Sequence, residues 1–266
     1  MSRLGATPPI VASIAASDSG AGAGLEADLK TFQALGVYGV TVTVALTAQN
    51  TLGVRAVEPV PLGFLSEQFR ALDQDLRPRA VKSGMLYSAA HIRRVCEELR
   101  QRDWGPLVVD PVMVAKSGDR LLAEAAVSDL RRELLPLALV ATPNWPEAAT
   151  LARLPVTNEV EALAAARVLA RLGPEYVVVK GGHAPAGATD LVLHRGAVTR
   201  LEGERISSRH THGTGCTFSA AITAHLALGL EPLEAIRRAR DYVRRAILEA
   251  PGLGRGNGPL QHLPLA

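Results

Sequence analysis

The sequence has few cysteines, few aromatic residues and no long hydrophobic run. Its two cysteines, Cys96 and Cys216, do not form a C-x-x-C pair, which argues against a disulfide framework and predicts a cytoplasmic protein. Two Trp, four Tyr and four Phe are too few for base-stacking platforms, so nucleic acid is not expected as a partner. No stretch approaches the ~18 apolar residues of a membrane-spanning helix, so no membrane partner is expected either.

Several catalytic motifs are also missing. The chain has no P-loop, no protein-kinase H-R-D or D-F-G, no G-x-S-x-G elbow and no H-E-x-x-H pair. The nearest approach to a metal motif is the pair His210 and His212, which no acidic or cysteine ligand accompanies, so zinc is not expected. Any phosphate group must therefore be bound by a different kind of site.

The composition is that of an ordinary globular protein. Hydrophobic residues make up 47% and charged residues 21%, which excludes a disordered or collagen-like chain. Because no linker, repeat or low-complexity block interrupts the 266 residues, 1–266 is predicted to be a single domain. The net charge is +3. Such a small positive excess is as compatible with a small anionic ligand as with an anionic polymer.

Strand-like and helix-like segments alternate along the chain. Apolar runs at 10–16, 37–46, 80–85, 106–110, 138–142 and 176–180 predict strands, with a hairpin near 52–60. Apolar residues at helical spacing predict helices between them, including one over 121–135 and a last one over 232–248. This rhythm predicts an α/β fold with a mainly parallel sheet, helices on both faces and a small antiparallel addition at 189–202.

A glycine loop, SDSGAGAG, follows the first strand and opens a helix. Its residues Gly22 to Ala27 fit the G-x-G-x-x-A dinucleotide fingerprint, but that reading needs an acidic residue ~20 positions later, where the chain has VTVTVALTAQN. A tight turn with Asp18 capping the backbone is the simpler interpretation.

A second glycine motif, HGTGC, precedes a clear helix. Exposed N–H groups at a helix start, aided by the helix dipole, can hold a transferring phosphoryl group. Cys216 would then sit where a thiol pKa is lowered. The alternative is a small buried residue in a helix cap.

Polar residues end several predicted strands. Asp110 ends PLVVD, Asn144 and Glu147 follow LVATP, and Lys180 ends YVVVK, so all four are expected at the sheet edge where doubly wound folds bind ligands. Lysine is rare against 25 arginines, and compact lysine charges suit phosphate. The four lysines all lie in motif-like stretches: Lys30, Lys82, Lys116 and Lys180.

Six segments in this order resemble one family. They are ASDSGAGAGLEADLKTFQALGVYGVTVTVALTAQNT, VKSGML, DPVMVAKSGDRLL, TPNWPEA, VVKGGH and THGTGCTFSAA. The chain resembles the hydroxymethylpyrimidine/phosphomethylpyrimidine kinases of thiamine biosynthesis over about residues 8–250. The resemblance implies a ribokinase-like three-layer α/β/α sandwich, a homodimer, and two ATP- and Mg²⁺-dependent transfers, first onto 4-amino-5-hydroxymethyl-2-methylpyrimidine and then onto its monophosphate.

The resemblance also implies a substrate pocket. Asp28 and Gln49 are expected to bind the pyrimidine edge, while Met85 and Val112 pack on the ring. Ala16 stands where the family usually has Gly, and its methyl group is expected to tighten the pocket floor.

The expected catalytic and nucleotide-binding residues come from the second half of the chain. Gly213, Thr214, Gly215 and Cys216 would form the anion hole, with Cys216 at the place where the wider superfamily has an Asp base. The ATP site would include Lys180, Asn144, Lys116 and Thr211, and the residues near Mg²⁺ would be Asp110 and Glu147.

Three other functions compete with this one. Pyridoxal kinase belongs to the same superfamily and differs in the ring that Gln49 and Asp28 would recognise. A non-catalytic pyrimidine-binding regulator would not need Cys216, Lys180 and Glu147 together. A dinucleotide-dependent oxidoreductase would need the acidic partner that the glycine loop lacks.

Overall fold

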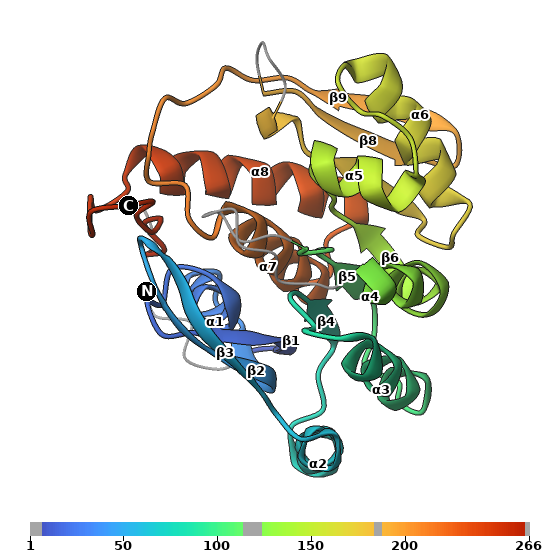
Figure 1. Cartoon of the computed structure of the whole chain (residues 1–266), viewed down its shortest axis with the longest axis vertical. Helices are drawn as coiled ribbons and strands as arrows, with labels where there is room; N and C mark the ends of the chain where they lie inside the picture. The colour runs from blue at the N-terminus through green and yellow to red at the C-terminus, as the bar shows by residue number, and fades with distance from the viewer. Residues whose placement is uncertain (1–6, 114–123, 184–187, 264–266) are drawn as a thin grey trace.

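The computed structural model describes residues 7–113, 124–183 and 188–263, and within them one mixed sheet forms the centre of the fold (Figure 1). The strand order is β3-β2-β1-β4-β5-β6-β7-β8-β9. Pairing is parallel from β2 to β7 and antiparallel for β3 at one edge and for β8 and β9 at the other. The strands are β1 Ile10–Asp18, β2 Tyr38–Asn50, β3 Gly53–Pro59, β4 Ala80–Ser83, β5 Leu107–Val109, β6 Ala138–Ala141, β7 Tyr176–Val179, β8 Asp190–His194 and β9 Ala197–Leu201.

Helices cover both faces of this sheet. Figure 1 shows α7 and α8 on one side of the strands and α2 and α3 on the other. The helices are α1 Gly24–Ala34, α2 Leu62–Asp75, α3 Ala89–Arg100, α4 Glu124–Asp129, α5 Trp145–Ala152, α6 Glu159–Ala170, α7 Thr214–Ala227 and α8 Pro232–Leu248. The predicted three-layer ribokinase-like sandwich is therefore confirmed.

The alternation of side chains along each strand explains the two core layers. In β5, Leu107 and Val109 pack in the cluster beneath α2 to α6, whereas Val108 packs with α7 and α8. Successive strand residues point to opposite faces, so a strand covered on both sides reads as a continuous apolar run. That is why the short runs of the sequence predict buried parallel strands.

The predicted helix over 121–135 differs from the structure. Residues 121–123 lie outside the described residues, α4 ends at Asp129, and the chain continues as a π-helical turn at Leu130–Leu134 and a 3-10 turn at Leu135–Leu137. Pro136 explains the change, because it has no N–H to continue an α-helical ladder. The predicted hairpin near 52–60 and the predicted antiparallel addition at 189–202 both form, with β3 at one edge of the sheet and β8 and β9 at the other.

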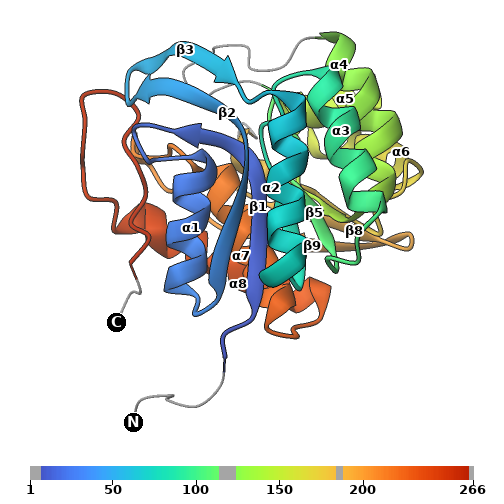
Figure 2. The same cartoon turned by 90° about the horizontal axis from the view of Figure 1, so that it is seen from below.

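The segment after α8 lies beside the tip of the β2–β3 hairpin and the start of α7. It carries no helix or strand over the described residues 249–263 apart from a bridge between His212 and Pro259. The Asn257 N–H donates to the Thr51 carbonyl at the tip of the β2–β3 hairpin, and the His212 N–H donates to the Gly258 carbonyl. Figure 2 shows this red segment beside the hairpin. The segment therefore ties the hairpin to the start of α7.

No helix in the described part of the chain is both long and apolar enough to cross a membrane.

Candidate active site

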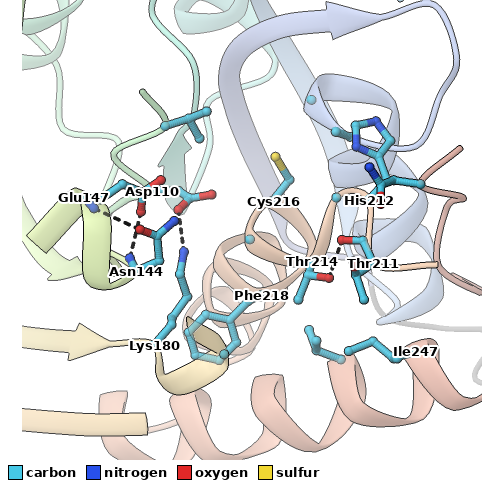
Figure 3. Close-up of a pocket in the computed structure, with 18 of the residues that line it drawn as sticks. Asp110, Asn144, Glu147, Lys180, Thr211, His212, Thr214, Cys216, Phe218 and Ile247 are labelled. Carbon is cyan, nitrogen blue, oxygen red and sulfur yellow. Dashed lines mark hydrogen bonds and ion pairs between the residues drawn. The ribbon is translucent and has the colours of Figure 1, made fainter. Parts of the chain in front are cut away.

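A cavity of about 810 Å³ lies at the carboxyl ends of the parallel strands, beside the N-terminus of α7 (Figure 3). The strand ends meet there because parallel strands share one edge of the sheet. Most of the predicted site residues line this cavity: Ala16, Gln49, Met85, Asp110, Val112, Asn144, Glu147, Lys180, Thr211, Gly213, Thr214, Gly215 and Cys216. Lys116 lies outside the described residues, and its predicted role stays a prediction.

The start of α7 depends on two glycines. Gly213 has φ 81°, and a Cβ there would overlap the Gly22 carbonyl oxygen of the glycine loop. A Cβ at Gly215 would lie 3.1 Å from Asp110 Oδ2 and 3.4 Å from Lys180 Nζ. The helix N-terminus can therefore approach the glycine loop on one side and the strand ends on the other.

Cys216 lies in the first turn of α7, and its pKa differs from the sequence-based expectation. Burial raises the pKa of the thiol to about 11, although the Lys82 ammonium and the Gly24 amide act in the opposite direction. The expected lowering at a helix N-terminus is therefore wrong for the protein without ligands, because desolvation of a thiolate outweighs the favourable charges. Cys216 is a neutral thiol at pH 7.

Asp110 and Lys180 form an ion pair across the strand ends. Lys180 Nζ lies 3.0 Å from Asp110 Oδ1, and both side chains are largely buried. Burial alone would lower the pKa of Lys180, but the Asp110 and Glu147 carboxylates raise it. Lys180 therefore remains a cation inside the cavity (Figure 3).

Glu147 and Asn144 form a capping box at the start of α5. The Glu147 N–H donates to Asn144 Oδ1 at 2.9 Å, and the Asn144 N–H donates to Glu147 Oε2 at 2.8 Å. Burial raises the pKa of Glu147 to about 7; the Lys180 charge opposes this rise and the Asp110 charge adds to it. Asn144 thus uses its side-chain oxygen for the cap, which leaves its N–H₂ group for a ligand.

Two carboxylates and a lysine suit a hard cation held mainly by phosphate. In the described ranges, no group of three or more His, Cys, Asp or Glu side chains is arranged to hold a metal by itself. Mg²⁺ usually takes one or two carboxylates and completes its shell with phosphate oxygens and water. The Asp110 charge adds to the effect of burial in raising the pKa of Glu147, and such a cation would relieve the repulsion between the two carboxylates.

The other end of the cavity has an apolar floor. Ala16, Ala45 and Met85 form a small buried cluster, against which Val112 packs. A Cβ at Gly24 would overlap the Ala16 carbonyl oxygen, so the backbone of the glycine loop lies directly on this floor. A flat aromatic ring fits an apolar floor beside the polar side chain of Gln49.

Two residues that line this end of the cavity were not predicted from the sequence. Asp18 and His212 both line the cavity and lie 2.9 Å apart, Oδ2 to Nε2. Asp18 was expected only as a backbone cap, which it also is, since it accepts from the Gly20, Gly22 and Ala23 amides. His212 belongs to the H-x-H pair, a spacing that by itself indicates at most a metal ligand.

The structure places Asp28 away from the predicted pyrimidine contact. Its side chain is fully buried and does not line the cavity; both carboxylate oxygens lie 2.7 Å from Lys82 Nζ, and Ser13 Oγ donates to Oδ2. Burial raises the pKa of Asp28 and would lower that of Lys82, but the contact between the two groups opposes the first shift and raises the pKa of Lys82, so the lysine stays charged. The expected ring contact is therefore corrected: Asp28 neutralises a buried lysine under the site.

Asp28→Asn is expected to destabilise the protein by about 3–5 kcal/mol, because it leaves the Lys82 charge buried without its counter-ion. Denaturant unfolding measures the loss. Glu67→Gln, which removes the partner of Arg70 in an exposed ion pair, is the control and should leave the unfolding midpoint unchanged. If the Asp28→Asn protein is as stable as the parent but has a raised KM for the ring substrate, Asp28 contacts the substrate and the correction is wrong.

The sequence of the chain matches one protein family. The family model described as phosphomethylpyrimidine kinase matches residues 18–261. The chain belongs to this family. Its fellow members include a hydroxymethylpyrimidine/phosphomethylpyrimidine kinase of Rhizobium meliloti (strain 1021), 50% identical over 257 residues, or 95% of this chain and 96% of that protein.

Solved structures of two different kinases resemble this member of the phosphomethylpyrimidine kinase family. The crystal structure of phosphomethylpyrimidine kinase from Clostridium difficile 630 has a TM-score of 0.81 and 40% identity, covering 90% of this chain and 99% of that one. Pyridoxal kinase from Staphylococcus aureus in complex with AMP-PCP and pyridoxal has a TM-score of 0.89 and 34% identity, covering 97% and 94%. Since both share the fold, the pocket must distinguish the substrates.

Proposed function

We propose that the chain transfers the γ-phosphoryl group of ATP to 4-amino-5-hydroxymethyl-2-methylpyrimidine, and then transfers a second one to the resulting monophosphate, as a kinase of thiamine biosynthesis. The observation that carries this proposal is one cavity in which the Cys216 end of α7 faces the Asp110–Lys180 pair across Gly215. Relatives named hydroxymethylpyrimidine/phosphomethylpyrimidine kinase, at 43% and 50% identity, support the substrate.

In the first transfer, different residues would bind the ring, accept the proton and hold the phosphoryl group. The pyrimidine would lie on the Ala16 and Met85 floor, with its hydroxymethyl group toward Cys216. Cys216, once ionised, would take the hydroxyl proton as the oxygen attacks the γ-phosphorus and the bond to the β-phosphate oxygen breaks. Free N–H groups in the first turn of α7 would hold the equatorial oxygens of the phosphoryl group.

Lys180 would balance charge on the nucleotide side. As ATP enters, its phosphates would compete with Asp110 for the lysine, which is held within the cavity by that pair. A bound Mg²⁺, for which Asp110 and Glu147 provide the carboxylates, would supply further neutralisation of the triphosphate. The second transfer needs no base, because a phosphate nucleophile is already ionised near neutral pH.

Pyridoxal phosphorylation is the second candidate, favoured by the S. aureus pyridoxal kinase structures. One polar group at the ring site is the Gln49 amide, which offers a donor and an acceptor side by side. An aminopyrimidine has an amine next to a ring nitrogen and can use both, whereas pyridoxal presents a phenolic oxygen and no such amine.

The decisive experiment gives the protein ATP, Mg²⁺ and either hydroxymethylpyrimidine or pyridoxal, and identifies products by mass. Mono- and diphosphate of the pyrimidine, at a kcat/KM above that for pyridoxal, are expected. A preference for pyridoxal would replace the proposal with the second candidate.

Two further features extend the proposal. A homodimer and a cytoplasmic location are proposed from the family resemblance and from the cysteine content. Sedimentation at several protein concentrations and imaging of a tagged chain test them.

Glu147→Gln is expected to raise the Mg²⁺ concentration needed for half-maximal rate, because one anionic group near the cation is lost. The pKa of Glu147 is raised to about 7, so the carboxylate is protonated below that pH. In the parent protein the Mg²⁺ requirement should therefore rise roughly tenfold from pH 8 to pH 6, and in the variant it should not follow Glu147's titration. Superimposable titrations of the two proteins would make Glu147 a helix cap only.

A further inference from the structure

His212 lies in the cavity and makes contacts that phosphoryl transfer does not explain. Its side chain is buried, with Nε2 2.9 Å from Asp18 Oδ2 and 3.2 Å from the side-chain nitrogen of Gln49. In Figure 3 it lies on the side of Cys216 away from Lys180, at the proposed pyrimidine end. Gly22 makes room for it, because a Cβ there would overlap the imidazole Cδ2.

Asp18 decides where the imidazole proton is. Its Oδ1 accepts from the Gly20 N–H at 2.8 Å, and its Oδ2 accepts from the Gly22 and Ala23 N–H groups at 3.1 and 2.9 Å. Burial raises its pKa, but hydrogen bonds from His212 and from the loop amides bring the pKa below its usual range. An ionised carboxylate only accepts, so His212 must carry a hydrogen on Nε2 whether its ring is neutral or charged.

That hydrogen determines which end of the Gln49 amide faces His212. The two ends have nearly the same shape, and hydrogen bonding distinguishes them. With nitrogen toward His212, two donors would face each other at 3.2 Å. The single Thr47 hydroxyl proton would also have to serve both the Ser17 carbonyl at 3.0 Å and Gln49 Oε1 at 3.2 Å.

Turning the amide by half a turn resolves both conflicts. The amide oxygen then accepts from His212 Nε2–H, which it shares with Asp18. The amide nitrogen donates to Thr47 Oγ1, and the Thr47 hydroxyl donates to Ser17. In this arrangement no donor faces another donor, and the Thr47 hydroxyl proton serves a single acceptor.

We propose that His212, held by Asp18, is a specificity-determining positioning residue that keeps the Gln49 amide oxygen toward itself. One N–H and one oxygen lone pair of the amide then remain for the ring, each at a defined place. The assignment of those groups to an aminopyrimidine rests on the proposed function, whereas the amide orientation does not. Without His212 the amide can turn, and half of its orientations present donor and acceptor to the ring in exchanged order.

The proton position is tested directly on the ligand-free protein by ¹⁵N NMR of ¹⁵N-histidine-labelled chain, with His212 assigned by loss of its signals in His212→Gln. A hydrogen on Nε2, in either the neutral or the charged ring, is expected. A bare Nε2 would overturn the proposal, because it would accept from Gln49 in the opposite orientation.

The effect on specificity is tested by a double-mutant cycle with Gln49→Leu. His212→Leu should raise KM for the aminopyrimidine roughly 3- to 10-fold, the effect of one hydrogen bond, with little change in kcat. It should cost pyridoxal less. In the Gln49→Leu background it should cost nothing more, because the residue it positions is gone.

Two controls separate positioning from folding. His210→Leu makes the same change at the neighbouring histidine, which does not line the cavity, and should leave KM unchanged. His212→Gln keeps an N–H donor and should recover most of the affinity. Losses that add in the cycle, or that fall equally on kcat and on both rings, would overturn the proposal. Failure of the proposed function would appear instead as parent protein inactive on the pyrimidine, with the NMR result unaffected.

Discussion

The first phosphoryl transfer is expected to accelerate about 100-fold between pH 7 and pH 9, while the second changes little. The pKa of Cys216 is raised to about 11 by burial, so the thiol is protonated at pH 7 and its ionised fraction rises tenfold with each pH unit below that pKa. A hydroxymethyl group needs a base to become a nucleophile. A phosphate does not, because its second pKa is near 6.

Cys216→Ser separates Cys216 from other sources of this pH dependence. The first transfer should fall by ~10²–10⁴-fold and the second much less, since general-base catalysis contributes about that factor. Single-turnover rates of the two steps, measured from separate substrates across the pH range, give the comparison. Cys96→Ala, at the buried cysteine outside the cavity, is the control. Equal losses in both steps, or an unchanged slope in Cys216→Ser, would limit Cys216 to shaping the anion hole.

Lys180→Met is expected to lower kcat/KM for ATP by about 10²–10³-fold, the usual effect of removing one preorganised charge or donor from developing negative charge. The lysine is held in the cavity by Asp110 at 3.0 Å, so it is already in place when the phosphates arrive. Binding of the pyrimidine, measured by calorimetry without nucleotide, should be unchanged. The kinetic and calorimetric data together distinguish a phosphate contact from a general loss of structure.

Two variants complete this test. Lys30→Met removes an exposed lysine that donates to the Ala21 carbonyl, and it should stay within a few-fold of the parent. Lys180→Met with Asp110→Asn removes the carboxylate left unpaired by the first change. If the double variant recovers the ATP kinetics, the loss came from the uncompensated Asp110 charge and Lys180 has no role at the phosphates.

The strand ends show why much of the site could be predicted from the sequence. Asp110 and Lys180 follow apolar runs too short for helices, and parallel pairing brings the ends of such runs to one edge. The capping box of Asn144 and Glu147 could be read the same way from its spacing. These inferences need only local pattern and the handedness of crossover connections.

Burial accounts for the two errors at the site, at Cys216 and at Asp28. The helix-start argument for Cys216 omitted desolvation, which depends on what covers the thiol. Asp28 is three residues after Leu25 and four before Phe32, so helical spacing places it on the buried face of α1; this signal was present in the sequence. The lysine that neutralises it, Lys82, is 54 positions away, and no local pattern connects them.

The contact between the glycine loop and the start of α7 has a consequence for how the protein folds. Asp18 and His212 are 194 positions apart, and the Gly22 and Gly213 backbones touch beside them. Closing so long a loop is entropically costly until the intervening strands have paired. In refolding, helical circular dichroism should therefore return before ligand binding, and a nascent chain should remain inactive until α7 has been synthesised and docked.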